Sequence, residues 1–233
     1  MWLRRLAGAS LAGVGAAGAY AGWSTRLEVT THRVALGLDR ERRPFRVVLI
    51  TDLHLTGDRD DRRPFLDAAR RATPDLILIA GDTIDRAASI DLISILGALE
   101  APLGTWAVPG NWDRMATDLS TLRRHYERAG VRLLVNERVS AGPVQICGVD
   151  DLVEGAPEIG AVEDAARGGP TILLTHCPAF VDQVASASTD THRGLLALAG
   201  HTHGGQIAPF GFAPFTPPGS GSYVAGWYRS SDI

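Results

Sequence analysis

The chain has 233 residues and a net charge of −3 at pH 7, and 45% of its residues are hydrophobic and 21% charged. A chain of this length can form one full domain with a large core, and its composition excludes an intrinsically disordered protein. The slightly acidic balance gives no general attraction to nucleic acid or anionic lipid, so no nucleic-acid binding is expected and any phosphate recognition must be local. The two cysteines, Cys147 and Cys177, have neither metal-site nor redox spacing, and we expect them to be small buried residues.

The first 26 residues are not expected to belong to the fold. Arg4 and Arg5 precede a charge-free run, residues 6–24, which is long enough to span a bilayer but contains seven alanines and five glycines. The run is consistent with an uncleaved membrane anchor, or with a cleaved export signal that resembles the twin-arginine type. A buried helix is the least favoured interpretation, because so much glycine weakens a helix. Positive charge before such a run keeps the N-terminus in the cytoplasm, so the globular part, residues 27–233, is expected on the far side of the membrane. Association with the cytoplasmic face is the alternative.

Downstream, short apolar runs alternate with segments of helical spacing, and this order predicts an α/β fold with helices packed outside the sheets. The expected strands are residues 27–38, 45–51, 75–80, 105–109, 131–135, 144–149, 171–174 and 195–199. The expected helices are residues 64–72, 88–99, 115–129 and 158–167. Several of the strands are apolar almost throughout, which is typical of strands buried on both faces.

Five of these strands stop at a side chain that can bind a metal, namely Asp52, Asp82, Asn111, His176 and His201. Because ligands of open α/β sheets lie beyond the carboxyl ends of the strands, we expect the five side chains to converge at one edge. Taken singly, the Gly-Asp and Gly-Asn pairs are ordinary turn signals, and a histidine after a strand is often a core residue. The run Gly-His-Thr-His-Gly-Gly at 200–205 is more specific, because two histidines at i and i+2 on a glycine-rich turn can address two different ions.

The order of the motifs carries more information than any one of them. Asp-x-His at 52–54, Gly-Asp at 81–82, Gly-Asn at 110–111, His176 and Gly-His-x-His at 200–203 resemble the motif series of the calcineurin-like metallophosphoesterases, over roughly residues 46–228. The runs at 200–207 and 223–226 resemble a branch of membrane-associated bacterial phosphoesterases, some of which act on the diphosphate of UDP-2,3-diacylglucosamine. The resemblance implies a four-layer αββα sandwich of two facing mixed sheets.

The resemblance also implies a role for each matched residue. One metal would be held by Asp52, His54 and His203, and the other by Asn111, His176 and His201, with Asp82 bridging both. Imidazole and carboxylate ligands suit Mn, Fe or Zn better than Ca or Mg, and the sequence does not choose among these three. Two such ions about 3.5–4 Å apart can share a hydroxide as the nucleophile and clamp the phosphoryl oxygens. Catalytic roles are therefore expected for Asp82, Asn111 and His201.

The third motif departs from the family pattern, in which the asparagine is usually followed by a histidine near the leaving group. Here Trp112 stands in that position, and an indole cannot donate a proton in acid catalysis. We therefore expect a preference for good leaving groups, such as the phosphate of a diphosphate or an aryl phosphate. Asp113 is a candidate for a replacement proton donor, although support of a metal ligand is its favoured role. Asp85 is a candidate either for orienting a metal ligand or for capping a helix.

Two features near the C-terminus leave alternatives open. Residues 207–221 are rich in Pro, Gly and Phe, and Phe210, Phe212 and Phe215 either pack on the domain or form an apolar rim for a lipid chain. The chain also stops soon after Tyr228, so either the domain tolerates a missing sheet edge or the sequence is C-terminally truncated.

Together these patterns predict a di-metal hydrolase of phosphoester or diphosphate bonds. A lipid-linked or nucleotide diphosphate is the favoured substrate class, and a general phosphodiester is the alternative. The competing hypothesis is a metal-free scaffold or binding module on the same fold. Trp112 and the short C-terminus favour that hypothesis, and the intact ligand set opposes it. His32, His125 and His192 lie outside the motif series and are expected at structural or surface positions.

Overall fold

The structure is a computed structural model, and it describes residue 27 and residues 29–36, 44–56, 63–166, 169–187, 195–204 and 216–229. The chain divides into two compact units, residues 1–32 and 33–233, and the architecture below is that of the second unit. The expected anchor or export signal at residues 1–26 lies outside the described residues, as do the three phenylalanines between 210 and 215. Within the described ranges, no helix is long and apolar enough to cross a membrane.

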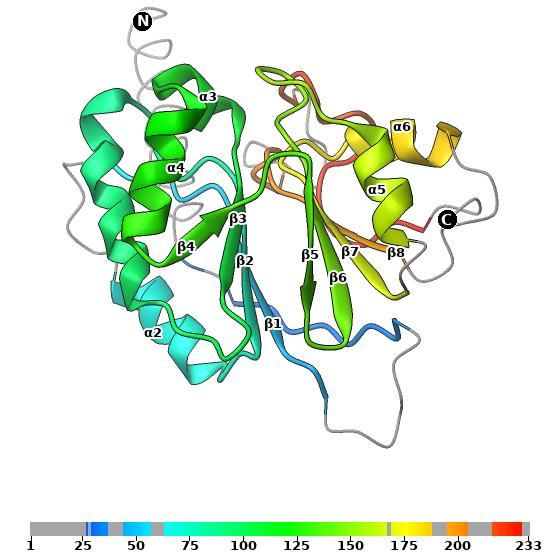
Figure 1. The fold of residues 1–233 in the computed structure, drawn as a ribbon, viewed down its shortest axis with the longest axis horizontal. Coiled ribbons are helices and arrows are strands. Elements are labelled where there is room, and N and C mark those ends of the chain that lie inside the picture. The colour runs from blue at the N-terminus through cyan, green and yellow to red at the C-terminus, as the bar shows by residue number, and fades with distance from the viewer. Residues whose placement is uncertain are drawn as a thin grey trace, which may run out of the picture. The chain divides into compact units, whose positions relative to one another are not determined.

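The described strands form two sheets of four strands each (Figure 1). The first sheet contains β1 (Val47–Ile50), β2 (Leu76–Ala80), β3 (Thr105–Val108) and β4 (Val131–Leu133), in that order and parallel throughout. The second sheet contains β5 (Glu137–Ala141), β6 (Val144–Gly148), β7 (Thr171–Leu174) and β8 (Leu195–Leu198). In the second sheet β5 is antiparallel to β6, and the other pairs are parallel. Parallel pairing places the carboxyl ends of successive strands at the same edge of each sheet.

Helices cover the outer face of each sheet. The helices that follow strands of the first sheet are α2 (Arg63–Arg71), the 3₁₀-type helix η1 (Ala87–Ala98), α3 (Asn111–Ala116) and α4 (Leu119–Arg128). The helices of the second half are α5 (Ile159–Ala166) and α6 (Phe180–Ala187). Figure 1 shows α2 and α4 on one side, α5 and α6 on the other, and the sheets between them.

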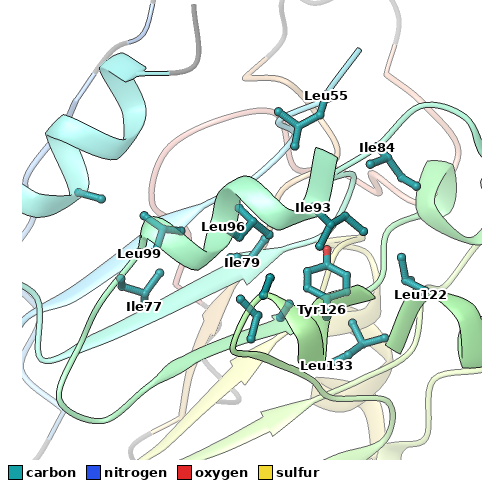
Figure 2. Close-up of a cluster of buried hydrophobic side chains, with 14 of the residues drawn as sticks. Leu55, Ile77, Ile79, Ile84, Ile93, Leu96, Leu99, Leu122, Tyr126 and Leu133 are labelled. Atoms are coloured by element: carbon teal, nitrogen blue, oxygen red, sulfur yellow. The ribbon is translucent and has the colours of Figure 1, made fainter. Parts of the chain in front are cut away.

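The alternation of side chains along β2 explains the layers. All five residues of β2 are buried, and successive side chains point to opposite faces of the sheet. Ile77 and Ile79 pack in one cluster with residues of η1 and α4, including Tyr126 (Figure 2). Leu76 and Leu78 pack in another cluster with Ile146 of β6 and with residues of β7. Burial of each such side chain contributes about 1.5–3 kcal/mol to folding stability. An all-apolar β2 therefore stabilises both the contact with the helices on one face and the contact with the second sheet on the other.

The four-layer α/β architecture is confirmed, with one correction. The first sheet is parallel throughout in the described residues, so the expectation of two mixed sheets is wrong for that sheet. Each of its connections contains a helix or a long crossover, and a crossover of that kind returns the chain parallel to the preceding strand.

Several local expectations also differ from the structure. Of the strand expected at residues 27–38, the described residues 27 and 29–36 form no strand. The expected helix at 115–129 is two helices, because Asp118 begins a new one by accepting a hydrogen bond from Thr121 N at 2.9 Å. Strand β5 and helix α6 were not predicted. Residues 223–226, whose sequence resembles the family branch, have irregular backbone within the described residues 216–229.

Candidate metal centre

Polar side chains from both sheets meet where the strands end. Asp52, Asp82 and Asn111 follow β1, β2 and β3 of the first sheet, and His176 and His201 follow β7 and β8 of the second. Two groups of three side chains have ligand atoms close enough to share an ion: Asp52, His54 and His203 form the open cluster, and Asp82, His176 and His201 form the buried cluster. The convergence expected from the strand-end motifs is thus present in the structure.

The backbone at these positions is unusual. Among the described residues other than glycine, seven have positive φ, and five of the seven belong to the two clusters: Asp52 (53°), His54 (43°), Asp82 (50°), His201 (74°) and His203 (49°). Side chains disfavour this left-handed region, so such residues persist only where the surrounding structure holds them. Strain therefore concentrates at the candidate site.

The glycines of the motifs are required by close packing rather than by turn formation alone. A Cβ on Gly110 would overlap the side chain and backbone of Asp82, and one on Gly200 would overlap Thr51. Gly110 thus lets the loops after β2 and β3 of the first sheet approach each other, and Gly200 lets the loop after β8 of the second sheet approach the loop after β1 of the first.

The buried cluster is centred on His176. Its Nε2 atom lies 3.2 Å from Asp82 Oδ2, 3.1 Å from Asn111 Oδ1 and 3.0 Å from His201 Nδ1. Donor atoms bound about 2.0–2.2 Å from one ion lie roughly 3–3.5 Å from each other, so these separations fit a shared transition-metal ion. Asn111 thereby joins the three residues of the buried cluster, as the motif series implied.

Backbone carbonyls fix the ring orientation of both histidines in this cluster. His176 Nδ1 donates to Ala80 O at 2.7 Å, and His201 Nε2 donates to Pro218 O at 2.6 Å. In the neutral rings these bonds leave the lone pairs of His176 Nε2 and His201 Nδ1 facing each other. Lone pairs that converge in this way suit a cation, and a hydrogen bond from the second ring nitrogen is the usual support of a metal-binding histidine.

The charged groups of the buried cluster shift one another's pKa values. Burial opposes a charge on His176, but the hydrogen bond and charge of Asp82 outweigh it and raise the pKa of His176 to about 9. Burial, together with the neighbouring positive charge of His176, lowers the pKa of His201. The pKa of Asp82 is lowered, because His176 more than offsets the effect of burial. A positive charge, on His176 or on a bound cation, is thus favoured beside Asp82.

The open cluster has different supports. His54 and His203 stack with ring centroids 4.9 Å apart, and their Nε2 atoms are 3.1 Å apart. His54 Nδ1 lies 2.5 Å from Asp85 Oδ1, so Asp85 orients this ligand, and it provides no side-chain cap for η1. Asp52 is held by Thr51 Oγ1 and by the backbone N–H of His201.

Asp82 lies between the two clusters. Its Oδ2 atom is 3.8 Å from His54 Nε2 and 3.2 Å from His176 Nε2, and its Oδ1 atom accepts the backbone N–H of Trp112 at 2.9 Å. A carboxylate within reach of both ligand sets suits the bridging role implied by the resemblance.

Asp113 lies behind the site, fully buried. Its carboxylate accepts backbone N–H groups of Thr83, Ile84 and Gly110, each at 3.0 Å, which joins the loops after β2 and β3. Burial raises the pKa of Asp113 to about 6, and these hydrogen bonds oppose that effect. Because both oxygens already accept backbone N–H groups, this arrangement favours the supporting role over proton donation.

An open pocket of about 590 Å³ adjoins the open cluster, lined by His54, Asp85, Arg86, Trp112 and His203. The Trp112 side chain is 44% exposed, and its ring stands at 81° to His54 with the centroids 6.3 Å apart. The sequence pattern missed Arg86 and the carbonyl of Pro218. A residue next to a motif, or a backbone oxygen seventeen positions from its partner, leaves no signal in a single sequence.

The residues after the second histidine brace its turn. Thr202 Oγ1 donates to Val224 O at 2.6 Å, and Tyr223 OH donates to Asp182, so residues 223–224 tie the turn at 200–204 to α6. His125 lies on α4 with Asp91 as its partner, outside both clusters, and His192 lies outside the described residues.

Comparison with known proteins supports one family. A model of the calcineurin-like phosphoesterases matches residues 45–205. A bovine transmembrane protein with a metallophosphoesterase domain is 31% identical over 89% of this chain and 50% of its own length. The Bacillus subtilis metallophosphoesterase YkuE is 28% identical over 98% and 85%, and the Escherichia coli phosphodiesterase YaeI is 30% identical over 88% and 76%. The chain spans about half the length of the bovine protein and of the Helicobacter pylori metallophosphoesterases that it also matches.

Proposed function

The chain belongs to the calcineurin-like phosphoesterase family, whose members use divalent metal ions, and on that premise we propose that it is a two-metal hydrolase of phosphodiester or diphosphate bonds. Phosphoester hydrolysis is the activity of the family. The observation that carries the two-metal proposal is the position of Asp82, with one carboxylate oxygen 3.2 Å from a histidine of the buried cluster and 3.8 Å from a histidine of the open cluster.

The residues divide into ligands and supports. Asp52, His54 and His203 would hold one ion, and Asn111, His176 and His201 the other, with Asp82 shared. The ions, when bound, would supply Lewis acidity toward the phosphoryl oxygens and lower the pKa of water at the site. The carbonyls of Ala80 and Pro218 hold the lone pairs of the two buried histidines toward the centre.

Proton supply to the leaving group limits the substrate. The side chain of Trp112 has one polar proton, the indole N–H, which is not an acid at neutral pH. The carboxylate of Asp113 faces backbone N–H groups and accepts hydrogen bonds from them. General acid catalysis contributes about 10²–10⁴-fold where it operates. We therefore propose that the enzyme acts on bonds with good leaving groups, a diphosphate or an aryl phosphate. A Trp112→His variant should gain activity on alkyl phosphates, and no gain would contradict this explanation.

The finer substrate and location are also proposals. A lipid-linked or nucleotide diphosphate fits the leaving-group argument, and a bovine relative is named as a transmembrane protein. We propose that residues 1–26 anchor or export the chain, with residues 27–233 as the phosphoesterase domain outside the cytoplasm. Fractionation of cells that make the full chain tests this proposal, and recovery of uncleaved protein in the cytoplasm would exclude it.

Metal analysis and a substrate panel test the function together. Purified protein should bind about two ions of Mn, Fe or Zn per chain. The loaded protein should hydrolyse a nucleotide diphosphate lipid or a nitrophenyl diester faster than an alkyl monoester. One ion per chain with full activity would exclude the two-metal proposal, and two bound ions without hydrolysis would exclude the proposed substrates.

A further inference from the structure

The pocket beside the open cluster contains two side chains that the metal ligands do not use. Of its five lining residues, His54 and His203 are ligands, and Asp85 is engaged by the ring of His54. Arg86 is a permanent cation and Trp112 a large aromatic surface, and neither belongs to the two clusters. A site that needed only to hold metal would require neither.

The position of Trp112 is fixed relative to the ligands. Its backbone N–H donates to Asp82 Oδ1, and its neighbour Asn111 contacts His176, so the start of α3 cannot move without disturbing the buried cluster. The indole nevertheless remains 44% exposed and stands at 81° to His54. An exposed aromatic ring whose backbone is fixed beside a pocket offers a stacking surface to a flat ligand.

Arg86 supplies charge on the same pocket. It is exposed, and it immediately precedes η1 on the loop that also contains Asp82 and Asp85. The protein carries a net charge of −3, so attraction of an anion must come from groups at the site. A guanidinium is suited to bind two oxygens of a phosphate at once.

We infer that Trp112 and Arg86 form a specificity subsite for phosphoesters that carry a flat aromatic group on the side of the scissile phosphate opposite the leaving group, with the ring stacked on the indole and the phosphate oxygens paired with the guanidinium. This inference rests on the proposed function. The pocket volume of about 590 Å³ is within the range of small-molecule sites, so a nucleoside or substituted phenyl group can enter it. The two side chains then have separable effects: Trp112 selects the flat group, and Arg86 binds the phosphate that all substrates share.

Two substrates with the same leaving group test the selection. Methyl 4-nitrophenyl phosphate and the 4-nitrophenyl ester of thymidine 5′-monophosphate both release 4-nitrophenolate, so leaving-group acidity is equal and only the second substrate adds a nucleobase. Wild-type kcat/KM should be about tenfold higher for the thymidine ester, the scale of one base stacked on an aromatic side chain. Trp112→Leu should abolish this ratio mainly through KM, and Trp112→Phe should retain most of it. Arg86→Gln should raise KM for both substrates alike, and Arg86→Lys should restore part of the affinity.

Met115 provides the matched control. It lies on the same helix three residues along and is 52% exposed, but it does not line the pocket. Met115→Ala should therefore keep the wild-type ratio. Inhibition by 4-nitrobenzylphosphonate, compared with methylphosphonate, measures the same selection without turnover, and only the aromatic compound should weaken about tenfold in Trp112→Leu.

The outcomes separate the two proposals. If neither substrate is hydrolysed by the metal-loaded protein, the proposed function fails. If both are hydrolysed at equal kcat/KM, or if the ratio survives in Trp112→Leu, the subsite inference is overturned while the function stands. A ratio that falls equally in Met115→Ala would also overturn it, because the effect would then belong to the helix rather than to the ring.

Discussion

The buried and open clusters have the same kinds of candidate metal ligand in different surroundings. In the buried cluster, His176 has no exposed surface, and both histidines donate to backbone carbonyls. In the open cluster, His54 and His203 stack at the edge of a pocket, and His54 is oriented by the side chain of Asp85. The first arrangement is enclosed by the fold, whereas the second is open to solvent at a pocket.

This difference suggests a division of labour between the clusters. A ligand set held by backbone carbonyls is built by folding itself, so its geometry is ready before an ion binds. A ligand set at a pocket must remain accessible, and it depends on one side-chain hydrogen bond for its orientation. Variants that affect both clusters should therefore reduce metal binding and activity more than variants that affect one cluster, and variants outside both clusters should change neither.

The largest effect is expected from Asp82→Asn, because Asp82 is within reach of both clusters. The amide loses the negative charge that two ions would share, so kcat should fall by more than the roughly 10–100-fold cost of losing a supporting residue. Metal content, measured by mass spectrometry, should fall below two ions per chain. The same change at Asp67, an exposed residue of α2 paired with Arg70, is the control and should alter neither quantity. Full metal content in Asp82→Asn would contradict the bridging role.

A smaller and selective loss is expected from Asp85→Asn. An asparagine at this position gives His54 a weaker, uncharged partner, so metal affinity at the open cluster should fall by about 10–100-fold. Competition with a chelator should show one weakened site and one unchanged site. Asp91→Asn, on a carboxylate that is 92% exposed, controls for loss of charge. Equal weakening of both sites would show that the clusters are not independent.

Alanine variants of the two clusters should differ in the unfolding free energy of the metal-free protein. His176→Ala removes the charged partner of the buried Asp82 carboxylate and one of the donors to the carbonyl of Ala80, which should cost about 1–3 kcal/mol of unfolding free energy. His54→Ala removes a partly exposed ring whose partner remains hydrated, and it should cost less than about 1 kcal/mol. Urea unfolding in the presence of a chelator measures both values. Equal losses would contradict the claim that only the buried cluster is part of the core.

The smallest effect concerns the thiol beside the buried cluster. Cys177 follows His176 directly, is buried, and donates its S–H to Asp151; burial and that carboxylate raise its pKa well above the usual value. Burial also raises the pKa of Cys147 to about 12. Because the thiolate is the reactive form, both residues should resist iodoacetamide at pH 8 until the protein unfolds. If folding alone builds the cluster, removal of metal should change the labelling rate of Cys177 by less than about twofold. Rapid labelling on metal removal would show that the ion holds the cluster together.

The sequence contained much of the fold and of the site. Apolar runs of four to six residues, each ended by a polar side chain, located β1, β2, β3, β7 and β8. Buried positions were expected for both cysteines, and this expectation is confirmed. Strand prediction from the hydrophobic pattern failed where tertiary contacts override the local preference of a segment. Residues 29–36 alternate like a strand but have no strand partner in the described structure, and β5 pairs through a hairpin with β6 despite its charged residues.

By itself, the sequence determined which side chains follow which strands, because strand periodicity and turn residues are local properties of the chain. Only the tertiary structure decided which of these side chains meet. The facing sheets bring His176 to Asp82 and His54 to His203, and the first pair is buried while the second lines a pocket. The burial of these side chains and the distances between them depend on residues far apart in the chain. The same is true of the hydrogen bond from His201 to the carbonyl of Pro218, and of the presence of Arg86 and Trp112 in one pocket. These contacts are set by the packing of two sheets, for which no single segment contains the information.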